Sequence, residues 1–125
     1  MTAFRAAVLE HFRHPRNRGS VDGATVSVDG ANPLCGDRIR VQLRVDGDMI
    51  VMAGFTADAC ALCTAAASVL TEHVRGMSMI DVAAVDGAWI NRALGGEPPR
   101  GRERCALLPL DTLRRAITAL PDTGT

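Results

Sequence analysis

Residues 38–45 alternate strictly between polar and apolar side chains, and this alternation constrains the fold more than any other feature of the sequence. Its apolar members are Ile39, Val41, Leu43 and Val45. Such a pattern is typical of an antiparallel strand with one buried face and one face in water. Asp46-Gly47 follows directly and favours a tight hairpin turn, so residues 49–55 are predicted to return as the partner strand. A shorter strand is predicted over residues 25–29.

Apolar residues in the rest of the chain recur at helical spacing. Helices are predicted over residues 4–14, 60–74, 78–85, 86–94 and 107–120. Pro109 is predicted in the first turn of the last helix, because a missing backbone N–H costs nothing there. Strands separated along the chain from helices are typical of the α+β class. We therefore predict one domain over residues 1–125, with an N-terminal helix, a three-stranded antiparallel sheet and a helical C-terminal half packed on that sheet.

The charge balance and the apolar runs argue against two classes of protein. The chain has 14 basic and 14 acidic residues, so it lacks the basic surplus that general nucleic-acid binding requires. No apolar run reaches the roughly 20 residues of a membrane span, and the N-terminus lacks the apolar segment of a signal peptide. We expect a cytoplasmic protein with four reduced cysteines, which favours metal or thiol chemistry over disulfides.

All four cysteines fall at the boundaries of predicted elements. Cys35 precedes the central strand, Cys60 opens a helix, Cys63 follows one turn later, and Cys105 lies near the start of the last helix. An antiparallel sheet can bring the loop at Cys35 close to Cys60, and a helix N-terminus favours the thiolate form. Three thiolates and Asp37 would complete a tetrahedral site for Zn²⁺ or iron–sulfur species. The spacings form no metal signature, and each cysteine alone also fits a core position.

Two other functions fit the same cysteines. Cys60 and Cys63 form a C-x-x-C pair that opens a helix, as in thiol oxidoreductases, although no βαβ unit precedes the pair. If the pair has no such role, Cys63 is expected in the core. A purely structural zinc site is the second alternative, and the chain would then unfold when the metal is removed.

Four segments together resemble the iron–sulfur cluster assembly family that includes IscU, the N-terminal domain of NifU, and SufU. They are residues 8–19, the Asn-Pro-Leu-Cys-Gly-Asp motif at 32–37, residues 55–68, and residues 104–108. The resemblance implies an α+β fold with a site at one end of a three-stranded sheet. It implies a Zn²⁺ ion or a transient [2Fe–2S] cluster bound by Cys35, Asp37, Cys60 and Cys105. It also implies that a cysteine desulfurase delivers sulfur as a persulfide, which finally reaches apo iron–sulfur proteins or carriers.

Two branches of this family differ near the last cysteine. The scaffold branch has His immediately before it, whereas this chain has Arg104, which resembles the SufU branch that holds zinc and relays sulfur. The short spacing between Cys60 and Cys105 resembles the scaffold branch. We therefore predict assembly of a transient [2Fe–2S] cluster, with zinc-dependent sulfur transfer as the alternative. Cys105 is the expected persulfide acceptor in the scaffold mode and Cys35 in the zinc mode. We expect a monomer or weak oligomer.

Overall fold

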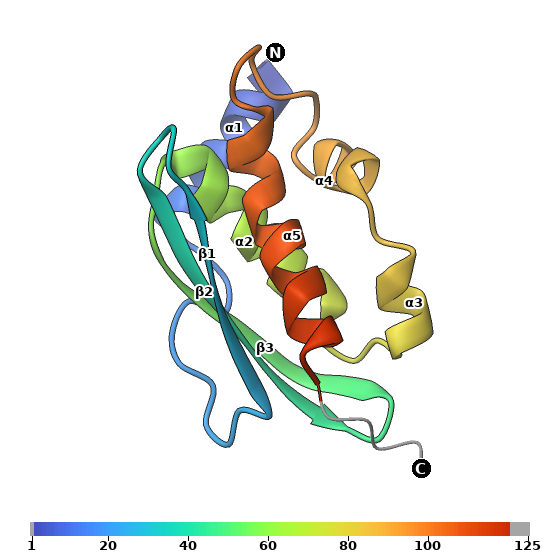
Figure 1. Ribbon diagram of the computed structural model, residues 1–125. Coiled ribbons are helices and arrows are strands. Elements are labelled where there is room, and N and C mark those ends of the chain that lie inside the picture. The colour runs from blue at the N-terminus through green and yellow to red at the C-terminus, as the bar shows by residue number, and fades with distance from the viewer. Residues whose placement is uncertain (1, 121–125) are drawn as a thin grey trace.

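The computed structural model describes residues 2–120 and has the predicted α+β fold and element order (Figure 1). Its elements are α1 (Thr2–Arg13), β1 (Val26–Asn32), β2 (Asp37–Asp46), β3 (Met49–Asp58), α2 (Ala61–Val74), α3 (Met79–Ala83), α4 (Gly87–Ala93) and α5 (Glu103–Thr118). Among these residues, no helix combines the length and the hydrophobicity that crossing a membrane requires.

The three strands form one antiparallel sheet in the order β1-β2-β3, so the alternating segment is its central strand. Ile39, Val41 and Leu43 are buried, whereas the alternating Arg38, Arg40 and Arg44 are exposed. This confirms the predicted two-faced strand. α5 packs on β1 and β2, and α2 packs on β3. The helices therefore cover one face of the sheet, as predicted (Figure 1).

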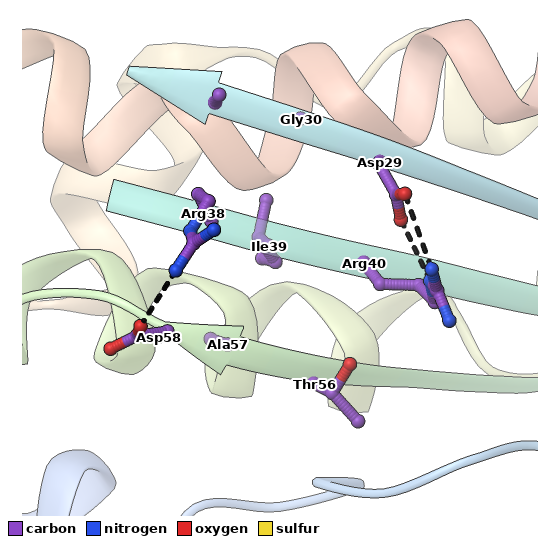
Figure 2. Close-up of a pocket in the computed structure, with 9 residues that line it drawn as sticks. Asp29, Gly30, Arg38, Ile39, Arg40, Thr56, Ala57 and Asp58 are labelled. Carbon is purple, nitrogen blue, oxygen red and sulfur yellow. Dashed lines mark hydrogen bonds and ion pairs between the residues drawn. The ribbon is translucent and has the colours of Figure 1, made fainter. Parts of the chain in front are cut away.

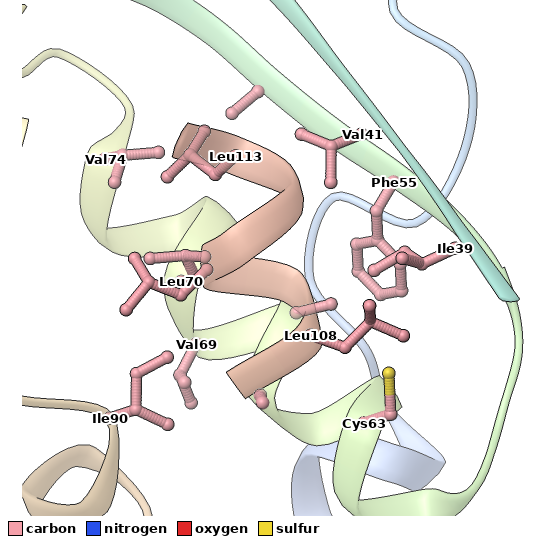
Figure 3. Packing of buried hydrophobic residues seen from close by; sticks show 14 of the residues in the cluster. Ile39, Val41, Phe55, Cys63, Val69, Leu70, Val74, Ile90, Leu108 and Leu113 are labelled. Atoms are coloured by element: carbon pink, nitrogen blue, oxygen red, sulfur yellow. The ribbon is translucent and has the colours of Figure 1, made fainter. Parts of the chain in front are cut away.

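The hydrophobic core lies between the sheet and these helices (Figure 3). Phe55 of β3, Leu70 of α2 and Leu113 of α5 are almost completely buried in it, and Ile90 joins them from α4. α2 is buried on most of its surface because α1, β3, α4 and α5 all contact it. Helices that are apolar on all sides occupy such central positions. The Ala-rich segment at 65–67 therefore lies at the centre of the packed molecule.

β1 is longer than the prediction for residues 25–29, because it continues through Gly30 to Asn32. Gly30 lies directly against α5, where an added Cβ atom would overlap Thr112 Oγ1. The glycine thus permits close packing of strand and helix and does not end the strand. Arg115 of α5 fixes the same contact by donating a hydrogen bond to the Asp29 carbonyl, at 2.7 Å.

The prediction for Pro109 was wrong, because α5 begins at Glu103 and Pro109 lies inside the helix. The earlier start is stabilised by the Glu103 carboxylate, which accepts a hydrogen bond from the Gly101 N–H at 3.1 Å. The Arg102 carbonyl accepts another from the Cys105 N–H, also at 3.1 Å. Pro109 has no N–H to donate to the Cys105 carbonyl one turn earlier. Because α5 begins at Glu103, Cys105 lies in its first turn.

The segment that follows α1 pairs with the free edge of β3, and Val21 then packs over Gly54 on the outer face of the sheet. The Gly19 N–H donates to the Phe55 carbonyl at 2.7 Å, and the Val21 N–H donates to Gln42 Oε1 at 2.8 Å. The open remainder is a hollow that carries the ion pairs Arg40–Asp29 and Arg38–Asp58 (Figure 2). None of the four cysteines lines this hollow.

The strand directions place all cysteine-bearing segments at one end of the sheet. β1 ends, β2 begins and β3 ends there, because the strands are antiparallel. α2 follows β3 after two residues, and α5 begins at the same end (Figure 1). The fold therefore brings residues from the middle and the end of the chain together.

We expect Gly30→Ala to lower the free energy of unfolding by about 1–3 kcal/mol, because the new methyl group overpacks the contact with Thr112. Urea denaturation of the metal-free protein measures this change. The double variant Gly30→Ala/Thr112→Ala removes the overlapping hydroxyl and should recover part of the loss. Unchanged stability of Gly30→Ala would contradict the packing role of this glycine.

Candidate metal centre

Three of the four predicted ligands form a compact group of donor atoms. One donor atom each from Cys35, Asp37 and Cys105 lies within 4.8 Å of the others. The Cys35 and Cys105 sulfurs are 3.5 Å apart. Cys60 lies at the edge of this group, with its sulfur 3.9 Å from Asp37 Oδ2. The structure thus brings all four predicted residues together, and Asp37 lies near Cys60 as well as near Cys35 and Cys105.

The β1–β2 hairpin positions the first part of the site. Asn32 and Asp37 are the last paired residues of the two strands, and residues 33–36 connect them. Gly36 has a φ of 72°, a left-handed conformation that favours glycine. The Cys35 N–H donates to the Asn32 carbonyl at 3.2 Å, which closes the turn. This turn holds the Cys35 side chain in an exposed position.

Asp37 is a buried carboxylate that ties the hairpin to α2. Its Oδ1 atom accepts a hydrogen bond from the Cys60 N–H at 2.9 Å. Cys60 is itself the N-cap of α2, and its sulfur accepts a hydrogen bond from the Cys63 N–H at 3.4 Å. Asp37 therefore has a structural role as well as its place in the donor group.

Cys105 is buried, in contrast to Cys35. Burial raises the pKa of the Cys105 thiol to about 12, and hydrogen bonding with Asp37 and Cys35 acts in the same direction. Without a metal this thiol stays protonated at neutral pH. Metal binding must therefore displace its proton, which makes metal affinity rise with pH.

Arg102 adds a positive charge that the sequence analysis did not identify. A hydrogen bond to Cys105, together with the nearby Cys60 and Cys35, raises the pKa of its guanidinium. A cation beside thiols favours their thiolate forms. The available signal was a basic residue three positions before the last cysteine. Arg104, the basic residue next to the last cysteine, is exposed at the surface.

Cys63 lies in the core, as expected (Figure 3), and its N–H contacts the Cys60 sulfur of the donor group. Burial raises the pKa of its thiol well above the ordinary value, and the charges of Asp37 and Cys60 add to this effect. A resolving thiol must become a thiolate and meet its disulfide partner. The buried position of Cys63 therefore gives no support to an oxidoreductase that uses the Cys60/Cys63 pair.

The donor set fits a thiophilic metal. Three thiols and one carboxylate match the ligand number and softness that Zn²⁺ or an iron–sulfur cluster requires. No histidine belongs to the donor group among the described residues, and two of the three make other contacts: His11 Nδ1 lies 2.8 Å from Ser68 Oγ, and His73 stacks on Trp89 with 4.0 Å between ring centroids. The four residues can therefore bind the metal without an imidazole ligand.

We expect Asp37→Ala to lower the free energy of unfolding of the metal-free protein by about 1–3 kcal/mol, because the partly buried Cys60 N–H loses its acceptor. Asp37→Asn keeps an acceptor oxygen and should lose less. Denaturation in the presence of a chelator measures both. Equal stability of the wild type and Asp37→Ala would show that Asp37 does not hold the hairpin on α2.

Comparison with known proteins places these residues in a family. Residues 3–123 match the NifU-like N-terminal domain. The bifunctional protein NifU/MnmA of Rubrobacter xylanophilus is 42% identical over 88% of this chain, and the zinc-dependent sulfurtransferase SufU of Bacillus subtilis is 39% identical over 60% of it. The chain spans 23% and 50%, respectively, of the lengths of these two proteins.

A third relative is matched over nearly its whole length. The iron–sulfur cluster assembly scaffold protein IscU of Haemophilus influenzae is 33% identical, over 92% of this chain and 93% of the relative. The crystal structure of the N-terminal part of a nitrogen-fixing NifU-like protein from Brucella abortus has the same fold, with a TM-score of 0.74, 21% identity and 90% coverage of both chains. The chain therefore belongs to the NifU-like N-terminal domain family.

Proposed function

We propose that this chain is an iron–sulfur cluster assembly protein that accepts sulfur from a cysteine desulfurase. Its cargo is a transient [2Fe–2S] cluster bound by Cys35, Asp37, Cys60 and Cys105. The observation that carries this proposal is the convergence of three thiols and one buried carboxylate at one end of the sheet. The scaffold name of the IscU relative, matched over most of both chains, supports it.

The unequal exposure of the cysteines suggests an order of sulfur transfer. Cys35 is the exposed thiol and can reach a persulfide on a partner. Its thiolate attacks the terminal sulfur, a new S–S bond forms on Cys35, and the partner cysteine leaves as a thiolate. Cys105 is buried, with its sulfur 3.5 Å from that of Cys35. Once metal binding has displaced its proton, its thiolate can take the terminal sulfur in a second exchange, and Cys35 leaves as a thiolate. This geometry favours Cys35 as the first acceptor and Cys105 as the second.

Asp37 gives the site a weaker ligand. A carboxylate oxygen is a harder donor than a thiolate, so soft metals bind it less strongly. A site with three strong ligands and one weak ligand can hold a cluster and still release it. Release would deliver the cluster to apo iron–sulfur proteins or carriers. An external electron donor supplies the electrons that reduce persulfide sulfur to sulfide.

A second function is zinc-dependent sulfur transfer. Arg104 stands where a scaffold of the IscU type would have His, and the SufU relative carries the name of a zinc-dependent sulfurtransferase. In this function a bound Zn²⁺ would keep the cysteine ligands in the thiolate form. Cys35 would accept the persulfide sulfur because it is exposed. The same four residues serve both functions. Four free cysteines fit a reducing compartment, so we place the protein in the cytoplasm.

Anaerobic incubation with a cysteine desulfurase, L-cysteine, ferrous iron and dithiothreitol tests the main proposal. We expect the wild type to gain iron and acid-labile sulfide in equal amounts, with the visible absorption of a [2Fe–2S] cluster. Cys105→Ser should lose most of both, because it removes one ligand. Cys63→Ala is the matched control and should keep them, since Cys63 lies outside the donor group.

Zinc retention without sulfide, together with faster turnover of the desulfurase, would assign the zinc-dependent function instead. That stimulation should disappear in Cys35→Ser. A wild-type protein that neither gains sulfide nor stimulates the desulfurase would contradict both functions.

A further inference from the structure

Asn32 is a buried amide that contacts the site without belonging to the donor set. Its side chain is 5% exposed, and its Nδ2 atom lies 4.0 Å from Cys105 Sγ. Its carbonyl accepts the hydrogen bond from the Cys35 N–H at 3.2 Å. One residue therefore contacts two of the three cysteine ligands that we propose, from the inner side of the site.

The hairpin explains why Asn32 occupies this place. Asn32 and Asp37 form the closing pair of β1 and β2, so their backbones lie opposite each other. Asp37 reaches Cys60 at the start of α2, and Asn32 reaches Cys105 at the start of α5. The two buried polar residues at the base of one turn thus link the hairpin to both helices that carry cysteines.

The contact between the Asn32 amide and the Cys105 sulfur matters because the amide is buried. Every buried side-chain nitrogen and oxygen atom in the described residues has a hydrogen-bond partner, and the Asn32 amide donates to the Cys105 sulfur. Without that sulfur the buried N–H would lose a partner, which is costly. A thiolate accepts hydrogen bonds more strongly than a thiol, because the bond becomes charge-assisted.

We propose that Asn32 is a positioning residue for Cys105: its N–H···S hydrogen bond orients the thiolate toward the metal and withdraws electron density from the sulfur. Partners of this kind, outside the ligand set, orient metal ligands and tune their donor strength. Arg102 does not replace this contact, because it approaches the thiols from the exposed side. The inference rests on the metal site proposed above.

Anaerobic titration with Co²⁺ alone tests the inference, because Co²⁺ reports its sulfur ligands through charge-transfer absorption. We expect Asn32→Leu, which has similar volume and no donor, to bind Co²⁺ about 10- to 100-fold more weakly than the wild type. Its sulfur-to-cobalt band should move to longer wavelength, since the thiolate becomes more electron-rich. The matched control is Asn91→Leu, which changes a partly buried amide on α4 that shares no pocket with any of the four cysteines and should leave both readouts unchanged.

A second measurement uses the wild type, so it does not depend on how Asn32→Leu folds. In protein loaded with ¹¹³Cd²⁺, the proposed N–H···S–Cd path should give a through-bond NMR coupling between the metal and the Asn32 side-chain amide protons. Absence of this coupling, or the same Co²⁺ affinity and band in Asn32→Leu as in the wild type, would overturn the inference alone. Failure of the wild type to bind Co²⁺ would overturn the proposed metal site and this inference with it.

Discussion

The pairing of Asn32 with Asp37 at the end of β1 and β2 is the constraint on which the site depends. A strand has a period of two, so a slip of one residue would turn Asp37 away from Cys60 and move Ile39 and Val41 out of the core. The same register that buries the apolar face therefore places the carboxylate at the site. The β1–β2 hairpin therefore determines both the burial of the apolar face and the positions of the donor atoms. α2 and α5 place their cysteines at the end of the sheet where this hairpin turns.

The site combines an exposed thiol with a buried one, and this difference determines which cysteine a partner can reach first. Cys35 is exposed on a turn, whereas Cys105 is buried and its thiol has a strongly raised pKa. An incoming partner therefore meets Cys35 before Cys105. Binding of a metal must remove protons from buried sulfur, and Arg102 on the exposed side helps to offset the negative charge that results. In the proposed function, loading and release of cargo would therefore depend on the protonation of these thiols and on the approach of a partner.

Much of this could be predicted from the sequence, because the relevant signals are local. Alternation over residues 38–45 and the Asp46-Gly47 turn determine the hairpin, and its direction brings Cys35 near Cys60. The errors came from tertiary packing. The strand predicted to end at residue 29 continues through Gly30, which packs closely against Thr112. Pro109 lies inside α5 because the helix begins earlier, at Glu103. Contacts of Asn32 and Arg102 with Cys105 cross long sequence distances, so no local pattern shows them.

The central claim is that Cys35, Asp37, Cys60 and Cys105 form one metal-binding set. X-ray absorption at the zinc K-edge of the zinc-loaded protein tests it most directly, because sulfur and oxygen ligands differ in scattering and distance. If these four residues bind the zinc ion, three sulfur atoms lie about 2.3 Å from it and one oxygen atom about 2.0–2.2 Å from it. A shell of four sulfur atoms would show that Cys63 takes the place of Asp37, and the proposed ligand set would then be wrong. A shell of nitrogen and oxygen atoms alone would place the metal outside this site.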